Sequence, residues 1–376
     1  MLGAGISGAS AALWLRRREP SLRVVIAEAR AVGSGASGRN AGMLLAGLSD
    51  HYDRMVELFG RAPARELWAA TLEHQRHLRE FLREQRADIE LDECGSWRLG
   101  FEEAEAGHLA RSAAMLAEDG FPGEFYDKDP LKRGFHGALR FRNDAGLHPL
   151  KLVHALIKAS GAEVYGGCEV SALESSERGV VVRTSGADFY ARRVLIALNA
   201  YAPLVHGHFR PLVAPHRGQI LLTAPLASRV VDCMVYAHHG YIYFRQLRDG
   251  RLLLGGWRHE FAEREVGYAD ETTDEVQSSL ERFLLKYFPE TEGVPVEARW
   301  AGSMGFSLDG LPLVGTLPED SRVCYAVGYT GHGFGLALEV TRRAVRLMLE
   351  GESAGVFGAE RLVARTAGEG ARVSVS

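Results

Sequence analysis

Apolar positions recur at two different spacings along this chain, and segments of the two kinds alternate. A period near 3.6 predicts helices over residues 9–19, 63–85, 103–118 and 148–160. Short runs rich in β-branched residues predict strands over residues 22–27, 163–165, 168–173, 179–184 and 193–198. A last helix is expected to run to Glu350, where Gly351 closes it.

A region of a different kind occupies residues 219–256. Apolar runs at 241–244 and 251–256 flank Arg-Asp-Gly at 248–250, which predicts two antiparallel strands joined by a turn. A half built from helices and strands is therefore interrupted by a sheet-rich half. The expected fold class is α/β (α+β), and 376 residues with 46% hydrophobic positions suit two domains.

The net charge and the cysteine content indicate which kinds of partner, metal site and cellular compartment to expect. The net charge of -4 gives no indication of a nucleic-acid partner. Four scattered cysteines without a C-x-x-C pair predict no disulfide framework, no metal site and a reducing, cytoplasmic location. His74 and His77 lie among charged residues, which favours a solvated helix face over metal ligation. No run reaches the roughly 18 apolar residues of a membrane span.

The candidate chemistry begins at the first residues, MLGAGISGAS. Gly3, Gly5 and Gly8 have the spacing of a dinucleotide-binding turn, and the strand that follows the helix ends on Glu28, about 20 residues further on. A helix N-terminus there would face a pyrophosphate and the acid a ribose; a glycine-rich turn without a ligand is the alternative. Only Met1 and Leu2 precede the motif, so its first strand is expected to be truncated and the natural product to carry several more apolar residues.

Two more glycine clusters follow. GSGASGRNAGML, residues 33–44, is expected to pass close to the cofactor with Ser37, Arg39 and Asn40 as polar contacts; a flexible surface loop is the alternative. WAGSMGFSLDGLPLVG at 300–315 precedes VGYTGHGFGLAL at 327–338, where a strand enters a helix. A second free helix N-terminus suits a long ligand with two charged groups and an electron-poor end.

In these motifs the chain resembles the FAD-dependent D-amino-acid oxidase superfamily, which includes glycine oxidase, sarcosine oxidase and γ-glutamylputrescine oxidoreductase. GAGISG, Glu28, ASGRNAG, VLIALNAYA, PHRGQ, DGLPLVG and GYTGHGFG occur in that order over nearly the whole length. The resemblance implies a glutathione-reductase-type, Rossmann-like FAD domain from residues 1–50, 144–206 and 300–365. Residues 51–143 and 207–299 would form an inserted substrate domain with a mixed or antiparallel sheet.

The resemblance also implies roles for individual residues. Gly3, Gly5 and Gly8 would face the pyrophosphate, Glu28 the ribose, Val170 the adenine and Ser37, Arg39 and Asn40 the flavin end. The group expected near the pyrimidine edge of the flavin contains Gly305, Gly331, Gly333 and Gly335. Negative charge collects at that edge when the flavin accepts a hydride, and a helix N-terminus stabilises it. His332 either adds a proton or a charge there or only packs.

The reaction implied is oxidation of the CH–NH bond of an amine or amino acid to an imine by hydride transfer to flavin N5, followed by hydrolysis. A flavin-binding, non-catalytic or regulatory subunit is the alternative. The loop around Asn40 has no histidine and residues 300–315 have no cysteine, so the FAD is expected to be non-covalent. The partners expected are a small amine and an electron acceptor, either dioxygen or a quinone or other carrier.

Two positions bear on the substrate. Met304 and Gly335 stand where relatives carry an arginine or a lysine that clamps a carboxylate. This favours a polyamine-like or N-substituted amine, or a clamp supplied elsewhere. The candidates on the strands expected to cover the flavin are Arg245 and Arg258, with Tyr241, Tyr243 and Trp257 nearby; surface arginines and packing aromatics are the alternative. Tyr243 and Arg245 are the catalytic candidates besides His332.

One position bears on the acceptor. Leu253, in RLLLGG, replaces a lysine whose charge in the sarcosine-oxidase branch can stabilise superoxide. The sequence therefore favours slow reoxidation by dioxygen, and a dehydrogenase over an oxidase.

Overall fold

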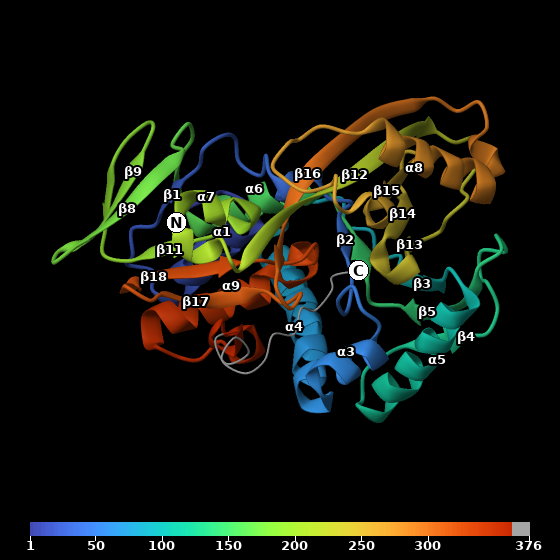
Figure 1. The fold of residues 1–376 in the computed structure, drawn as a ribbon, viewed down its shortest axis with the longest axis horizontal. Coiled ribbons are helices and arrows are strands. Elements are labelled where there is room, and N and C mark those ends of the chain that lie inside the picture. The colour runs from blue at the N-terminus through green and yellow to red at the C-terminus, as the bar shows by residue number, and fades with distance from the viewer. Residues whose placement is uncertain (363–376) are drawn as a thin grey trace.

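The computed structural model describes residues 1–362, which form two halves joined by two long strands (Figure 1). A mostly parallel sheet lies in the first half, in the order β7 (Glu163–Tyr165), β1 (Val25–Ala27), β11 (Val194–Ile196), β18 (Asp320–Val327) and β17 (Leu313–Leu317). Leu2 bridges β1 to β11, because it pairs in parallel with both Ala27 and Ile196. The start of the chain thus occupies the centre of this sheet.

Helices from opposite ends of the chain pack beside this sheet. They are α1 (Ile6–Arg18), α6 (Pro149–Ser160) and α9 (Gly333–Glu350), and α1 contacts both of the others. Pro149 stands at the start of α6, and glycines in the left-handed conformation end α6 and α9, as the sequence predicts. Short helices α2 (Ala36–Arg39) and α7 (Ala202–Val205) and a three-stranded sheet, β8 (Val170–Ser176), β9 (Gly179–Thr184) and β10 (Phe189–Ala191), complete this half.

The second half is built on an eight-stranded sheet. Its order is β16 (Val296–Ser307), β12 (Val213–Pro225), β15 (Arg251–Gly256), β14 (Ile242–Gln246), β13 (Met234–Ala237), β3 (Ser96–Gly100), β5 (His136–Phe141) and β4 (Glu124–Tyr126). The expected antiparallel hairpin is present as β14 and β15. The sheet is mixed because β13 and β3 pair in parallel.

Four helices surround this sheet or join it to the first half. They are α3 (Tyr52–Phe59), α4 (Arg61–Gln85), α5 (Glu103–Glu118) and α8 (Asp274–Tyr287). A two-stranded pairing of β2 (Met43–Leu44) with β6 (Ala145–Gly146) lies near the junction. The largest apolar core runs from α1 and α9 through α4 to α5, so the two halves share one continuous interior.

The prediction that His74 and His77 lie on a solvated face of α4 is wrong. Helix α4 packs against α9, and His74 is fully buried with Nδ1 accepting from the Leu338 amide at 3.1 Å. His77 is also buried, beside the buried Glu339. Glu73 and Glu80, which suggested exposure, have carboxylate oxygens 3.7 and 3.6 Å from the ring nitrogens of His77, so charged neighbours help to cover this face.

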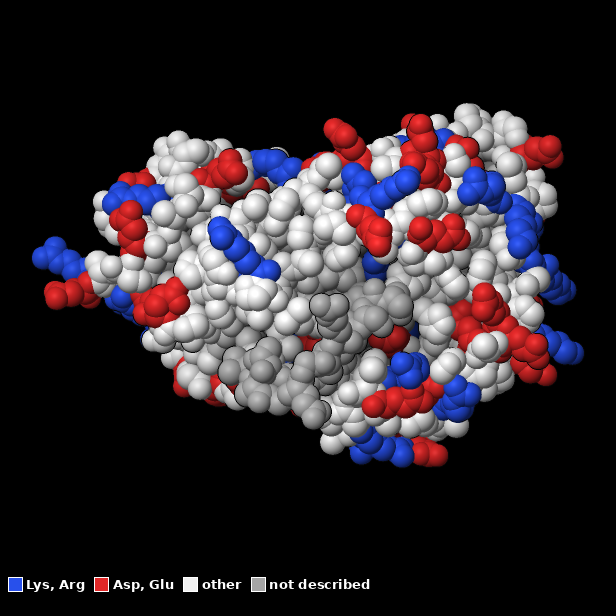
Figure 2. Space-filling model, in the orientation of Figure 1, with Lys and Arg blue, Asp and Glu red and all other residues white. Residues whose placement is uncertain are grey.

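The surface carries both signs of charge. Figure 2 shows acidic and basic side chains interspersed over one face. Many of them are paired, as Arg23 is with Glu163 through two hydrogen bonds of 2.7 and 2.9 Å. Among residues 1–362, no helix has the length and apolar character needed to cross a bilayer.

Candidate cofactor and substrate site

A cavity of about 610 Å³ lies where the two halves meet. One wall comes from the N-terminus of α1 and from α2, with Gly5 and Ser37, and another from the loop before α9, with Gly331 and His332. The large sheet closes the remaining side, where Tyr243 is exposed to the cavity. This volume is within the range of small-molecule and cofactor sites, about 300 to 1,000 Å³.

The first glycines allow close packing of backbone at the start of α1. A Cβ on Gly8 would lie 1.9 Å from the Gly3 carbonyl oxygen, and one on Gly5 would lie 2.8 Å from Ser37 Oγ. Ser37 Oγ accepts a hydrogen bond from the Ile6 amide at 2.9 Å. No acidic residue stands in the first turn of α1, and Gly5, Ile6 and Ser7 at the positive end of this 13-residue helix line the cavity.

Glu28 stands at the end of β1, as expected for an acid that binds a ribose. Its Oε2 accepts from the Ala4 amide at 2.8 Å and its Oε1 from the Arg30 amide at 2.9 Å. A carboxylate has about four acceptor positions, so both oxygens retain capacity for ribose hydroxyls. The Glu28 carbonyl accepts from the Cys168 amide at 2.9 Å, which places the start of β8 and Val170 beside this edge.

The second glycine cluster is held by its own polar side chains. Arg39 donates to the carbonyl oxygens of Ser34 and Ala301, both at 2.8 Å. Asn40 donates to the Ser37 carbonyl at 2.8 Å and accepts from the Gly42 amide at 2.8 Å. Arg39 and Asn40 both line the cavity, and these bonds fix the shape of its wall.

The loop before α9 supplies the second helix N-terminus. Gly331 has φ +80°, and a Cβ there would meet nothing nearer than Met304 Sδ at 3.7 Å, so its backbone faces open space. Gly333 and Gly335, in the first turn of α9, also line the cavity. Helix α9 has no acid in its first turn. Gly305 does not line the cavity; a Cβ there would lie 2.7 Å from Asn199 Oδ1 in a tight backbone contact.

His332 is held on both sides of its ring. Because a carbonyl oxygen only accepts, Nδ1–H donates to the Thr330 carbonyl at 2.9 Å, and the Tyr236 hydroxyl then donates to Nε2 at 2.9 Å. Burial lowers the pKa of His332 to about 4. The ring is therefore neutral near pH 7, and its position is fixed by Tyr236, a residue that sequence reasoning missed.

The structure separates the two candidate arginines. Arg245 does not line the cavity; its guanidinium donates to the carbonyl oxygens of Gly42 at 3.2 Å and Leu147 at 3.0 Å. Arg258 does line it, with its guanidinium carbon 4.4 Å from the ring centre of Phe306 and 5.0 Å from that of Tyr241. Within residues 1–362, no ion pair joins Arg258 to a carboxylate.

Three further side chains complete the sheet side. Tyr243 lines the cavity, burial raises its pKa to about 12, and its ring fills the space over Gly255. Met304 is in the wall, at the position where an arginine clamp would stand. Leu253 is 6% exposed and packs with Ala41 behind the wall rather than lining it.

The predicted cofactor residues therefore fall into two groups. Those that line the cavity are Gly5, Ser37, Arg39, Asn40, Gly331, Gly333 and Gly335. Those that lie outside its wall are Gly3, Gly8, Glu28, Val170 and Gly305. Of the catalytic candidates, His332 and Tyr243 line it and Arg245 does not.

Two helix N-termini around one elongated cavity, with a sheet over one end, define a dinucleotide-binding α/β protein with a substrate-covering sheet. The chain belongs to the DAO family of FAD dependent oxidoreductases, whose model matches residues 2–346.

Known proteins of this family resemble the chain over most of its length. It is 28% identical to γ-glutamylputrescine oxidoreductase of Escherichia coli over 367 residues, covering 93% of this chain and 82% of that protein. It is 30% identical to glycine oxidase of Geobacillus kaustophilus over 351 residues, covering 89% and 88%. The crystal structure of L-proline dehydrogenase from P. horikoshii has the same fold, with a TM-score of 0.81, 19% identity and 97% of each chain covered.

The cavity suits the family's cofactor, FAD, held without a covalent bond. The glycine wall leaves room for a flat ring system, and the N-termini of α1 and α9 suit its pyrophosphate and the electron-rich edge of its flavin. Among the described residues, no cysteine lines the cavity.

Proposed function

We propose that this protein oxidises a small amine to an imine, which water then hydrolyses to a carbonyl compound. The observation that carries the proposal is the cavity itself, where the N-termini of α1 and α9 meet Tyr243 of β14 and Arg258, which begins the 3-10 helix Arg258–Phe261 after β15. Residues 1–50, 144–206 and 300–365 form the FAD domain in this proposal, and residues 51–143 and 207–299 the substrate domain. Residues 363–365 lie outside the described part of the chain.

Bound FAD supplies the acceptor for the hydride that leaves the carbon next to nitrogen. The protein's own residues hold the cofactor and the substrate in place and stabilise the charge that develops during the reaction. Backbone amides at the start of α9 stabilise negative charge at the edge of the cavity that they face, because they are already oriented and need no reorganisation. His332 is a positioning group in this scheme, since Tyr236 and Thr330 occupy both of its ring nitrogens.

Arg258 is the group we assign to substrate recognition. It is a cation in the cavity wall without a carboxylate partner among residues 1–362, stacked between the rings of Phe306 and Tyr241. Arg258 is half-buried, and a cation held away from bulk water in a cavity wall is stabilised when a bound anion supplies the opposite charge. We therefore propose an N-substituted or polyamine-like substrate that carries an acidic group, which Arg258 binds in place of the clamps absent at Met304 and Gly335. γ-Glutamylputrescine oxidoreductase, a relative by sequence, is named for such a compound.

The electron acceptor is proposed to be a quinone or another carrier in preference to dioxygen. The support is Leu253, an apolar side chain behind the sheet wall where a lysine would bring positive charge toward the flavin. Four free cysteines suit the reducing conditions of the cytoplasm, where we place the enzyme. The proposed partners are the amine and the acceptor, without nucleic acid.

Anaerobic bleaching of the yellow protein tests this function. The purified protein is mixed without oxygen with neutral diamines, N-acylated diamines that carry a carboxylate, and small amino acids. Bleaching is expected to be fastest with the carboxylate-bearing amines. If none of the compounds bleaches the flavin, a flavin-binding protein without turnover becomes the better interpretation.

A further inference from the structure

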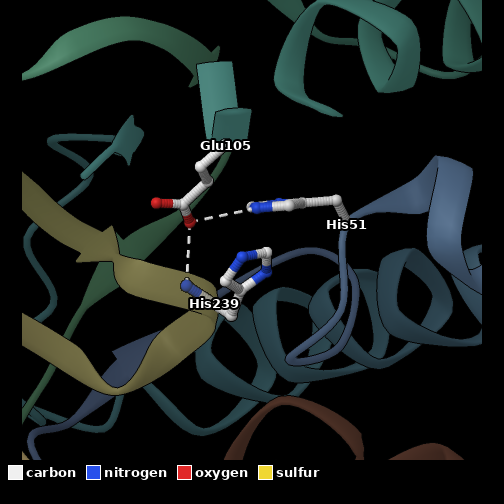
Figure 3. Close-up of side chains that lie close together, drawn as sticks. All are labelled: His51, Glu105 and His239. Carbon is white, nitrogen blue, oxygen red and sulfur yellow. Dashed lines mark hydrogen bonds and ion pairs between the residues drawn. The ribbon is translucent and has the colours of Figure 1, made fainter. Parts of the chain in front are cut away.

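Three ionisable side chains from separate elements meet beside the substrate end of the cavity. His51 precedes α3, Glu105 lies in the first turn of α5, and His239 lies in the short turn between β13 and β14. Figure 3 shows the two imidazole rings and the carboxylate gathered at one point. One ligand atom from each lies within 4.8 Å of the other two. We call this set the His51–Glu105–His239 cluster.

The carboxylate of the cluster is buried and ionised. Glu105 is 3% exposed, and its Oε1 accepts from His51 Nε2 at 3.1 Å and from the His239 amide at 2.8 Å. Its Oε2 accepts from the Phe101 amide at 2.7 Å. Burial opposes ionisation, but these hydrogen bonds outweigh it and hold the pKa of Glu105 at about 2. A negative charge is therefore fixed next to two imidazoles.

His51 has an unused nitrogen. Because the Glu105 carboxylate only accepts, Nε2 carries the proton, and Nδ1 is a lone pair. Nδ1 is buried without a hydrogen-bond partner, in a side chain that is 2% exposed.

His239 connects the cluster to the cavity. It lines the cavity wall, and its ring centre lies 5.0 Å from that of His51. Its backbone is in the left-handed region, with φ 50°. An ion can reach the cluster from the cavity past His239, whereas His51 and Glu105 have no comparable exposure.

We propose that the His51–Glu105–His239 cluster binds a divalent transition-metal ion of the Zn²⁺ class. Two imidazole nitrogens and one carboxylate oxygen are a donor set that Zn²⁺ takes at about 2.0 to 2.2 Å, with water in a fourth position. Tetrahedral ligands at that distance are about 3.3 Å apart, close to the 3.1 Å between His51 Nε2 and Glu105 Oε1. His239 lies on a half-buried turn at the cavity wall, and a shift of its side chain would bring the third ligand to the ion. Binding through Nε2 replaces the hydrogen bond from His51 to Glu105, and the proton moves to the otherwise unused Nδ1, so the charge of the ring is unchanged.

Metal binding to the FAD-loaded protein tests the site directly. Equilibrium dialysis against Zn²⁺ is expected to give one ion per chain. Co²⁺ is expected to give tetrahedral ligand-field bands at wavelengths longer than the flavin absorption. His239→Asn keeps a residue that tolerates the left-handed backbone and should weaken binding at least about 10-fold, since even outer-shell changes at metal sites cost that much. His154→Ala, at an exposed histidine of α6, is the matched control and should bind as the parent does.

Two results would overturn the proposal: no stoichiometric ion in the parent protein, or equal affinity in the parent and His239→Asn. Glu105→Gln adds a second comparison, with flavin content as the check that the variant is folded. A further arm depends on the proposed function: Zn²⁺ should raise KM for the amine in the parent and not in His239→Asn. If no amine is oxidised, this arm fails while dialysis and the Co²⁺ spectrum still decide the site.

Discussion

The two ends of the cavity are built from different parts of the polypeptide. At the cofactor end the wall is backbone, from the glycine turns before α1 and α9, and the positive ends of these helices face inward. At the other end, which we propose binds the substrate, the wall is formed by side chains that include Tyr243 of β14 and Arg258 in the 3-10 helix after β15. A backbone wall specifies a cofactor common to the family, whereas side chains can change from one member to the next. We therefore expect changes at the first end to affect cofactor binding and changes at the second end to affect the choice of substrate.

The largest effect is expected from a methyl group at the backbone end. Gly8→Ala places Cβ 1.9 Å from the Gly3 carbonyl oxygen, so strand and helix must separate. We expect a loss of about 3 kcal/mol or more, at the upper end of overpacking costs, and loss of bound flavin. The flavin-to-protein absorbance ratio and the melting temperature measure it. Gly107→Ala, within α5, meets only the Arg111 side chain at 3.5 Å and should not destabilise the protein. Full flavin content in Gly8→Ala would contradict the steric account.

The next largest effect is expected at His332, which should make the free energy of unfolding depend on pH. The pKa of His332 is about 4, below its ordinary value of 6.5. As pH falls, the unfolded chain takes up the proton first, so stability present above pH 6.5 is lost toward pH 4. His332→Asn should reduce this pH-dependent loss of the free energy of unfolding by at most about 3 kcal/mol. Asparagine is chosen because it is favoured at the start of a helix. Chemical unfolding between pH 4 and 7 measures the difference. Tyr236→Phe retains the imidazole and serves as the control; equal slopes in the parent protein and His332→Asn would contradict the assignment.

At the side-chain end, Arg258→Met should lower kcat/KM for amines that carry a carboxylate more than for neutral amines. The change removes charge-assisted hydrogen bonds worth about 1.5 to 3 kcal/mol, so kcat/KM for a carboxylate-bearing amine should fall about 10- to 100-fold. Neutral amines should change little. Arg245→Met is the matched variant: it unties Gly42 and Leu147 and should lower the melting temperature without separating the two substrate classes. Equal losses for charged and neutral amines in Arg258→Met would remove Arg258 from recognition.

The smallest effect is expected behind the wall. Leu253→Lys brings a charge toward the flavin, but Leu253 packs with Ala41 and does not face the cavity. Reoxidation by dioxygen should therefore speed up roughly 10-fold, less than the hundreds-fold worth of a direct contact. Stopped-flow mixing of reduced enzyme with dioxygen measures it, and Leu253→Met is the volume-matched control. A parent protein that already reoxidises near 10⁵ M⁻¹s⁻¹, well inside the range of about 10⁴ to 10⁸ for efficient enzymes, would reject the dehydrogenase interpretation.

The sequence predicts the backbone end well because its signals are local. The fingerprint glycines, the helix after them and Glu28 lie within one strand-helix-strand unit, and GYTGHGFG leads directly into α9. Most strand and helix bounds are confirmed to within a few residues for the same reason. Hydrophobic periodicity and turn residues depend only on residues that are close in the sequence.

The side-chain end could not be predicted, because it depends on which distant residues pack together. Tyr236 reaches His332 only through the fold, and the contact between α4 and α9 buries His74 against its local pattern. His51, Glu105 and His239 are far apart in sequence and share no motif spacing. The sequence therefore contains no signal that would have indicated a metal site at these three residues. Arg245 and Arg258 are equally plausible in the sequence. In the fold, Arg245 lies on β14 and binds the carbonyl oxygens of Gly42 and Leu147, whereas Arg258 begins a 3-10 helix after β15 and lines the cavity.

The long ribbon of β12 and β16 has a mechanical consequence. The two strands pair from Val213 with Ser307 to Thr223 with Val296. One end of the ribbon packs on the first half, where a Cβ on Gly305 would strike Asn199, and at the other end Arg299 binds Gln277 of α8. Moving the two halves apart to open the cavity would require bending the hydrogen-bonded pair of strands β12 and β16. We therefore expect access to the cavity to depend on movement of short segments at its rim, such as the turn that carries His239, more than on separation of the two halves.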